Sequence, residues 1–349
     1  MAAVDRIGFE GDFAFPPVSV VTPVYNGARY LAECIESVAA QRYAALEHVI
    51  VDNASTDDSR AIAESYAARY PHIRVVGCAE HFPVIANWNR ALGFIADQSR
   101  YVWVLPADDF LMGQSLTRMV SVGLRHPTIG IISSLRLRGN RIQCSGLPQD
   151  QEVFNGRSIV QMFLREEVFA FSPTGCLIRR DLIDARKPFY PNRYLHADVA
   201  AFFDVLDQVD FGFVHDVMMF SREHDGSVTS TIANRKGTEF RDRLFMLQEF
   251  GLRYFDPEEL AAIEAKFLRR YYRFLVRSAV LMREQKLFRY HLEALRQAER
   301  SPSPAALARA TLGEFRFMML RPSRAIEHVS ARLQQQAPTD PLWDDPKPG

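Results

Sequence analysis

Acidic side chains follow the ends of two apolar runs in the first third of the chain. Asp52 ends LEHVIVD, and Asp108 with Asp109 comes one residue after RYVWVLP. Adjacent carboxylates are costly to bury unless they bind a cation or cap a helix. One interpretation of Asp108 and Asp109 is therefore a site for Mg²⁺ or Mn²⁺ shared with a diphosphate, since such ions take one or two protein carboxylates. The other is an N-cap for a helix that begins near Phe110.

Asp52 and an aromatic residue, Tyr25, also suit the recognition of a nucleoside. Tyr25 follows the run VSVVTP, and its ring is either a core aromatic or a platform for a base. Asp52 either makes turn contacts, because Asn53, Ser55 and Asp57 all favour turns, or accepts hydrogen bonds from a nucleobase N–H or a ribose hydroxyl.

The elements that would position these side chains alternate between two periods. Charge-free or β-branched runs are typical of buried strands, and between them apolar residues recur at steps of three and four, as in helices. The expected strands are 18–23, 46–52, 72–77 and 100–106. This alternation predicts an α/β fold with a doubly wound, mostly parallel sheet and helices on both faces. Ligands bind beyond the carboxyl ends of such strands, so the ring and the carboxylates would meet at one edge.

Composition excludes several other classes of protein. Lys plus Arg and Asp plus Glu each number 42, which argues against a nucleic-acid binder driven by net charge. The four cysteines form no CxxC pair, so reduced thiols are expected rather than a disulfide scaffold or zinc cluster: Cys34, Cys78, Cys144 and Cys176. MAAVDRIGFEGDFAF lacks the apolar region of a secretory signal, and no run approaches the roughly 18 apolar residues of a membrane span. We expect a cytoplasmic protein, either soluble or peripheral at the inner face of the membrane.

The rest of the chain divides into a mixed region and a helical one. We expect an N-terminal extension, two successive halves of the α/β region, a helical region and a loose tail, at 1–16, 17–113, 114–233, 234–337 and 338–349. The helical region interleaves arginine and lysine with aromatic and aliphatic residues in KFLRRYYRFLVRSAVLMREQKLFRYHLEALR. This pattern suits an anionic membrane surface, a homodimer interface, or helices packed on the catalytic domain with their arginines outward.

Several motifs together resemble a known family. VSVVTPVYNG, EHVIVDNASTDDS and WVLPADD, in this order and spacing, are similar to the family 2 inverting glycosyltransferases of GT-A fold. ANWNRAL resembles the helix before the acidic motif, and FSPTGCLIRRDLI resembles the acceptor-side strand. HADVAAFFDVLDQV, followed by a strand with an R-x-H-x-x-S ending, resembles the acidic helix. The resemblance covers about 17–233, and it implies that 17–113 is the nucleotide-sugar-binding half and 114–233 the acceptor-binding half of a GT-A domain.

The resemblance implies roles for individual residues. Those that would contact the nucleotide sugar are Pro23, Tyr25, Asp52, Asp108 and Arg222. Asp109 would ligate the metal and His224 would contact the metal or diphosphate, while Asp198 would be the catalytic base. Read without the family, Asp198 is another helix N-cap and His224 a surface or packed histidine. Thr174, Gly175 and Cys176 either admit a sugar or simply pack. The sequence departs from the family pattern at three places. Pro106 replaces the first acid of the fuller D-x-D-D motif, and Gly113 stands where a proline is common after it. HAD replaces the more usual Glu-Asp pair before the acidic helix.

The family implies a metal-dependent single displacement that inverts the anomeric centre. The donor would be a nucleotide-diphosphate sugar and the acceptor a carbohydrate or lipid-linked hydroxyl, in surface polysaccharide biosynthesis. One rival is a nucleotidyltransferase, but PVYNGARY is not the glycine-rich, basic loop that such enzymes use. The other is a catalytically degenerate protein that binds a nucleotide sugar or a partner without turnover.

Overall fold

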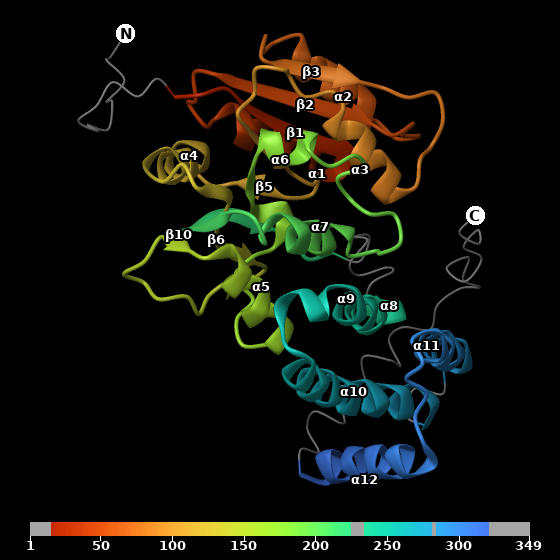
Figure 1. The fold of residues 1–349 in the computed structure, drawn as a ribbon. Coiled ribbons are helices and arrows are strands. Elements are labelled where there is room, and N and C mark those ends of the chain that lie inside the picture. Colours follow the sequence, from red (N-terminus) through yellow and green to blue (C-terminus); the bar gives the residue numbers. More distant parts are fainter. Residues whose placement is uncertain (1–14, 225–233, 281–283, 321–349) are drawn as a thin grey trace. The chain divides into compact units, whose positions relative to one another are not determined.

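The apolar runs of the first third form parallel strands of one large sheet (Figure 1). The structure is a computed structural model, which describes residues 15–224, 234–280 and 284–320. The first strands are β1 (Val18–Val24), β2 (Leu46–Asp52), β3 (Ile73–Val76) and β4 (Tyr101–Val104). β1 pairs in parallel with β2 and β4, and β2 with β3. Every residue of β1 is buried, as expected for a strand covered on both faces.

The second half of the sheet is mixed. Its strands are β5 (Phe110–Leu111), β6 (Ile129–Arg138), β7 (Arg141–Gln143), β8 (Val153–Phe154), β9 (Leu177–Arg179) and β10 (Asp210–Ser221). The strand order is β3-β2-β1-β4-β9-β6-β10-β5. β9 runs antiparallel between β4 and β6, and β6 is parallel to β10. The carboxyl ends of β1, β2, β4, β6 and β10 therefore lie at one edge, and the predicted mostly parallel α/β sheet is confirmed.

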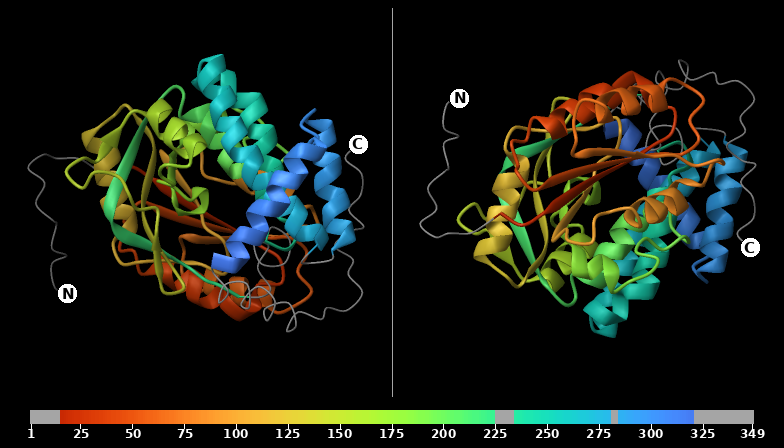
Figure 2. Two further views of the ribbon diagram at one scale, coloured as in Figure 1. Left: turned by 90° about the horizontal axis from the view of Figure 1, so that it is seen from below. Right: turned by 90° about the horizontal axis from the view of Figure 1, so that it is seen from above.

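Helices cover both faces of this sheet. They are α1 (Ala28–Ala39), α2 (Ser59–Ala67), α3 (Val84–Leu92), α4 (Ser115–Arg125), α5 (Gly156–Arg165), the 3₁₀ turn η1 (Pro173–Gly175), α6 (Arg180–Asp184) and α7 (Ala197–Val205). Figure 2 shows α1 and α2 on one side and α3 and α7 on the other. α1 buries Leu31, Ile35 and Val38, the stripe that its sequence predicts. Leu31 and Ile35 pack in one cluster with Ile50 of β2 and Tyr66 of α2.

The chain divides into two compact units between Glu223 and His224. The second unit contains α8 (Asn234–Lys236), α9 (Thr238–Tyr254), α10 (Pro257–Val280), α11 (Gln285–Gln297) and α12 (Pro304–Leu320). α10 contacts α9, α11 and α12. Two arginines of its basic, aromatic pattern bind Glu314 of α12, namely Arg273 and Arg277. Among the described residues, no helix combines the length and apolar character needed to cross a bilayer.

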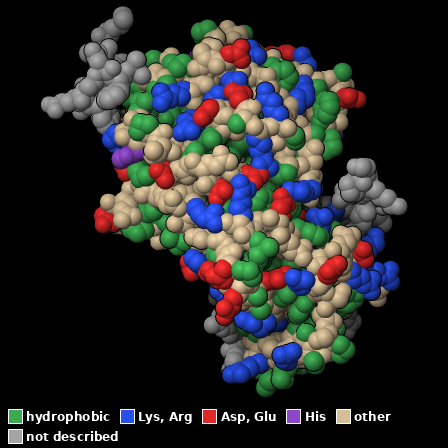
Figure 3. All heavy atoms as spheres, viewed as in Figure 1, with side chains coloured by type: hydrophobic (Ala, Val, Ile, Leu, Met, Phe, Trp, Pro, Cys, Tyr) green, Lys and Arg blue, Asp and Glu red, His purple; other side chains and the backbone are tan. Residues whose placement is uncertain are grey.

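The expected domain boundaries remain predictions. Residues 1–14 of the N-terminal extension and the whole tail 338–349 lie outside the described residues, as does the segment 225–233 that precedes the expected start of the helical region. Membrane contact and dimerisation through the C-terminal helices also stay predictions. On the face shown in Figure 3, basic and acidic side chains are interspersed rather than gathered by sign, in line with the zero net charge.

Candidate functional site

The loops that follow β1 and β2 are joined by reciprocal hydrogen bonds. The backbone N–H of Asn53 donates to the carbonyl of Val24 over 2.8 Å. The N–H of Asn26 donates to Ser55 Oγ over 3.0 Å, and the N–H of Thr56 donates to Asn26 Oδ1 over 2.8 Å. Asn26 has a φ of 50°, a left-handed conformation that asparagine tolerates better than most residues. The Asn-Gly turn thus fixes one loop against the other at the edge of the sheet.

Gly27 allows the loop after β1 to approach the loop after β4. A Cβ at Gly27 would lie 2.8 Å from Val24 Cγ2 and 3.4 Å from Ala107 Cβ, so a larger residue would force a shift. Ala107 directly precedes Asp108. The turn that carries Tyr25 and the turn that carries the paired carboxylates are therefore neighbours.

Tyr25 and Asp52 lie at the ends of paired strands but differ in exposure. The Tyr25 side chain is 49% exposed, and its ring lies edge-on to His81 with centroids 4.3 Å apart. Asp52 is 2% exposed, and its Oδ1 accepts the N–H of Ser55 over 3.3 Å. Pro23 is buried inside β1. A half-exposed ring beside a buried carboxylate can accommodate the face and the polar edge of a nucleobase.

His81 was missed by the sequence reasoning, and Asn53 explains its position. Asn53 Nδ2 donates to the carbonyl of Phe82 over 2.8 Å, and the N–H of Phe82 donates back to Asn53 Oδ1 over 3.0 Å. This clasp holds the loop after β3 against the end of β2. The sequence signal was present in Asn53, which had been interpreted only as a turn residue.

The carboxylate pair lies in the turn between β4 and β5 and contacts the end of β10. The N–H of Arg222 donates to Asp109 Oδ1 over 2.9 Å, and Arg222 Nε donates to the carbonyl of Asp108 over 3.2 Å. The guanidinium of Arg222 lies 4.4 Å from the ring centre of Tyr30 and pairs with Glu33. Chain segments more than a hundred residues apart thus meet at these acids.

The helix-cap interpretation of the acidic pair is wrong. Phe110 and Leu111 form β5, which pairs with β10, and the next helix begins at Ser115. Asp109 is 5% exposed. Burial first, and then the neighbouring Asp108, raises the pKa of Asp109 from 3.8 to about 7, although the N–H of Arg222 opposes the shift. A bound cation would stabilise the ionised form that burial disfavours.

The donor set fits a cation that the substrate also ligates. Among the described residues, no three His, Cys, Asp or Glu side chains are grouped as a complete metal site. Mg²⁺ and Mn²⁺ sites in nucleotide enzymes need only one or two protein carboxylates when phosphate oxygens complete the coordination shell. Asp109 and Asp108 therefore supply enough protein ligands for such a cation. His224, the other predicted metal contact, begins the second unit, and its role stays a prediction.

Asp198 lies in the first turn of α7 but is not its N-cap, which is His196. Asp198 Oδ1 accepts the N–H of Val199 over 2.9 Å. α7 contacts η1, and Trp103 Nε1 of β4 donates to the carbonyl of Thr174 in η1 over 2.8 Å. The helix that carries Asp198 is thereby attached to the same edge of the sheet through η1.

Arg136 of β6 links the surroundings of Asp109 to those of Asp198. Burial raises the pKa of the Cys176 thiol, Arg136 lowers it and Asp198 raises it further. Arg136 likewise opposes the raised pKa of Asp109. Arg136 thus acts on Asp109, and Arg136 and Asp198 each act on the Cys176 thiol. The run IGIISSLRLRG at 129–139 indicates a strand, but nothing in the sequence singles out Arg136.

The small residues expected to line the acceptor strand precede it. Thr174 and Gly175 belong to η1, and β9 begins only at Leu177. Cys176 is fully buried, which agrees with packing rather than contact with a sugar. A Cβ at Gly175 would lie 3.3 Å from Met219 Sδ, so a larger residue would press on β10.

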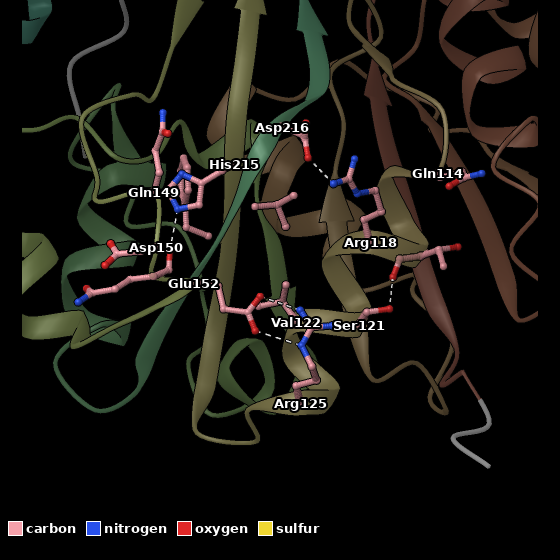
Figure 4. A pocket seen from close by; sticks show the side chains of 14 residues that line it. Gln114, Arg118, Ser121, Val122, Arg125, Gln149, Asp150, Glu152, His215 and Asp216 are labelled. Atoms are coloured by element: carbon pink, nitrogen blue, oxygen red, sulfur yellow. Dashed lines mark hydrogen bonds and ion pairs between the residues drawn. The ribbon is translucent and has the colours of Figure 1, made fainter. Parts of the chain in front are cut away.

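A groove of about 630 Å³ lies elsewhere, between α4, the loop before β8 and β10 (Figure 4). Four of its charged side chains already pair with one another: Arg118 with Asp216, and Arg125 with Glu152. The predicted site residues lie outside its lining. We therefore assign the candidate site to the strand ends and not to this groove.

Comparison with known proteins identifies the domain that carries these strand ends. The profile described as Glycosyl transferase family 2 matches residues 19–186, which include the Tyr25 turn, Asp52, the acidic pair and η1. The chain carries a glycosyl transferase family 2 domain. Its Asp198 and Arg222 lie beyond the matched range.

Individual relatives agree with this family. The putative teichuronic acid biosynthesis glycosyltransferase TuaG of Bacillus subtilis is 38% identical over 94 residues, which cover 27% of this chain and 36% of TuaG. Matches to this and comparable curated relatives cover only 26% to 36% of those proteins.

Two solved structures share the GT-A fold. Residues 1–349 of Staphylococcus aureus TarS in complex with UDP-GlcNAc superpose with a TM-score of 0.61 at 18% identity, covering 85% of this chain and 88% of that one. The mannosyltransferase PcManGT of Pyrobaculum calidifontis, in complex with GDP-Man and Mn²⁺, has a TM-score of 0.54 at 18% identity, with 93% and 89% covered.

Proposed function

We propose that this chain is an inverting glycosyltransferase. It transfers a sugar from a nucleotide-diphosphate sugar to a hydroxyl of a carbohydrate or lipid-linked acceptor, in surface polysaccharide biosynthesis. The observation that carries the proposal is the meeting of Asp109 with Arg222 beside the turn that bears Tyr25, at the edge to which the Asp198 helix is attached. The nucleotide sugars in the TarS and PcManGT complexes and the role named for TuaG support the donor and pathway classes.

The donor is held by side chains from four strand ends. The ring of Tyr25 lies against the base, and Asp52 accepts from the base or ribose, as its burial next to an exposed ring allows. Asp108 contacts the ribose or the cation. Arg222 adds positive charge near the diphosphate, since its guanidinium already lies beside the Asp108 carbonyl.

A bound Mg²⁺ or Mn²⁺ would be held by Asp109, with Asp108 beside it, and would offset negative charge on the leaving diphosphate. Asp198 takes the proton of the acceptor hydroxyl while that oxygen bonds to the anomeric carbon. The bond from the anomeric carbon to the diphosphate breaks, and its electron pair leaves with the nucleotide. Attack from the face opposite the leaving group inverts the anomeric centre.

The first experiment is a thermal-unfolding screen of the full chain with UDP-, GDP-, dTDP- and CMP-sugars, each with and without Mn²⁺. A donor that binds the folded state raises the unfolding midpoint by mass action, and dependence on Mn²⁺ supports the cation site. If every nucleotide sugar leaves the midpoint unchanged at millimolar concentration, the transferase proposal is wrong.

The second experiment tests the base with Asp198→Asn. Loss of general-base catalysis typically lowers turnover by about 10²- to 10⁴-fold, and donor binding should persist because Asp198 does not bind the nucleotide. Asp204→Asn on the same helix is the matched control, since Asp204 pairs with Arg186, and it should retain transfer. Unchanged turnover of Asp198→Asn would exclude this residue as the base.

A donor-binding protein without turnover is the second candidate, because Pro106 occupies the position of an acid in the fuller motif. The two candidates differ in the release of free nucleotide from the donor identified by the screen. A transferase releases it on transfer, and slowly by hydrolysis, whereas the degenerate protein binds the donor and releases none.

A further inference from the structure

Arg136 near the end of β6 is held by neutral partners. Its Nη1 donates to Ser172 Oγ and its Nη2 donates to Gln143 Oε1. Its Nε is closed off from solvent and has no hydrogen-bond acceptor among the described residues. Within that part of the chain, no carboxylate lies at ion-pair distance from this guanidinium. Two hydrogen bonds thus fix its orientation without neutralising its charge.

Neighbouring arginines on the same edge do have carboxylate partners. Arg138, two residues further along β6, pairs with Glu223 over 3.2 Å, and Arg222 pairs with Glu33. A half-buried guanidinium that forms no ion pair with the described residues is unfavourable in the free protein, and binding of an anion relieves this cost. A guanidinium already oriented is suited to a planar or tetrahedral oxyanion, which it can bind through two parallel N–H groups.

The surroundings of Arg136 indicate which substrate carries the anion. Its hydrogen-bond partners precede β9 and end β7, both in the expected acceptor half, whereas the nucleotide contacts belong to the loops after β1, β2 and β4. The charge of Arg136 also acts on Asp109, whose raised pKa it opposes. The hydrogen-bond partners of Arg136 therefore place it on the acceptor side of the carboxylate pair.

We propose that Arg136 is a specificity-determining residue that binds a carboxylate or phosphate group on the acceptor, so that the acceptor is an acidic glycan or a phosphate-bearing one. This rests on the transferase function proposed above. The donor diphosphate is the competing anion, and the experiment below separates the two.

The test measures binding to the full chain in the presence of saturating UDP. The probes are glucose, glucuronate and glucose 6-phosphate, and their dissociation constants are measured by ligand-observed NMR. A charge-assisted pair should make at least one acidic probe bind about 10-fold tighter than glucose. Arg136→Gln should abolish that preference, Arg136→Lys should restore part of it, and Arg138→Gln should leave it intact. Comparing the dissociation constants of glucuronate and glucose 6-phosphate shows whether Arg136 prefers a carboxylate or a phosphate group.

Three results would overturn the assignment. The first is equal or undetectable binding of all three sugars to the unaltered chain. The second is tighter binding of the acidic sugar than of glucose that persists in Arg136→Gln. Equal unfolding midpoints of Arg136→Gln and Arg136→Lys without ligand show that both variants are folded. The third is a loss of UDP or pyrophosphate affinity in Arg136→Gln that equals the loss for the acidic sugar, which would assign Arg136 to the donor. Failure of the transferase proposal is distinct, because no nucleotide sugar would then stabilise the chain.

Discussion

Buried charge has opposite surroundings in the two units. In the helical unit, Glu314 of α12 is 3% exposed and forms ion pairs with Arg273 and Arg277 of α10. In the sheet unit, Asp109 is 5% exposed, lies beside a second carboxylate and has no ion pair among the described residues. The first arrangement joins two helices. In the second, the N–H of Arg222 and the charge of Arg136 offset the burial of Asp109 only in part, and its pKa stays raised, as is typical of groups that a ligand completes.

Polar groups repeat the contrast. His291 of α11 is fully buried, its Nδ1 lies 2.7 Å from the hydroxyl of Tyr271, and its Nε2 donates to the carbonyl of Lys236 over 2.7 Å. Burial lowers the pKa of His291 to about 4, so the ring is neutral near pH 7 and its hydrogen bonds are satisfied. Arg136 in the sheet unit keeps its charge and an Nε without an acceptor among the described residues.

The largest expected effect comes from removing the charge of Asp109. Asp109→Asn should lower transfer on the order of 10³-fold, because the cation that offsets the charge of the leaving diphosphate loses its carboxylate ligand. It should also stabilise the metal-free protein at high pH. The folded-state pKa of about 7 exceeds the value of 3.8 for an unperturbed carboxyl, so stability falls as pH rises between these values and the loss is complete above them.

The measurement is the thermal-unfolding midpoint in chelator at pH 5 and pH 8. The variant should gain roughly 5 °C over the unaltered chain at pH 8 and less at pH 5. Asp97→Asn is the control, because its side chain is fully exposed and should leave both midpoints and activity unchanged. A variant less stable at pH 8 would mean that Asp109 is compensated in the free protein, and the contrast between the units would be lost.

Periodicity predicted most of the fold, since β1, β2 and α1 occur where strand and helix patterns place them. Local signals were less reliable at element ends. α2 begins at Ser59 with Asp58 as its N-cap, although Ser55 resembles a cap, because the Ser55 hydroxyl instead accepts the N–H of Asn26. That partner lies 29 positions away, and such contacts depend on strand order rather than on neighbouring residues.

The candidate site was predicted in part for the same reason. Asp52, Asp108 and Asp109 are visible in the sequence because Asp52 ends one apolar run and the acidic pair comes one residue after another. Arg136 was missed because an arginine in a half-exposed strand is ordinary until the partners of its guanidinium are known, and those come from β7 and η1. His81 was missed because its position depends on the Asn53 clasp.

The second effect concerns stability in the helical unit. Glu314→Gln leaves Arg273 and Arg277, one turn apart on α10, without their shared counter-ion. Breaking a buried pair from one side is strongly destabilising, but both arginines are partly exposed, so we expect a loss of roughly 2 kcal/mol. Chemical denaturation followed by circular dichroism measures it.

A matched control is Glu293→Gln, whose partner Arg296 lies 3.8 Å away with both side chains more than half exposed, and its effect should stay within about 0.5 kcal/mol. Nucleotide affinity should be unchanged in both variants. Equal effects of the two substitutions would show that the Glu314 pairs do not hold the helices together.

The smallest expected effect concerns tyrosine, whose ring is buried in one unit and half exposed in the other. Tyr271 is buried within the helical unit, whereas Tyr25 is half exposed at the sheet edge, where its ring lies edge-on to His81. Tyr25→Ala should therefore change folding stability little but weaken nucleotide binding by about 1 kcal/mol, or roughly fivefold, through lost stacking. Isothermal titration with UDP and the other nucleotides measures this change, and Tyr25→Phe should bind like the unaltered chain because stacking needs only the ring. If the alanine variant instead unfolds at a much lower temperature with unchanged affinity, Tyr25 is a core residue and the exposed ring is no nucleobase platform.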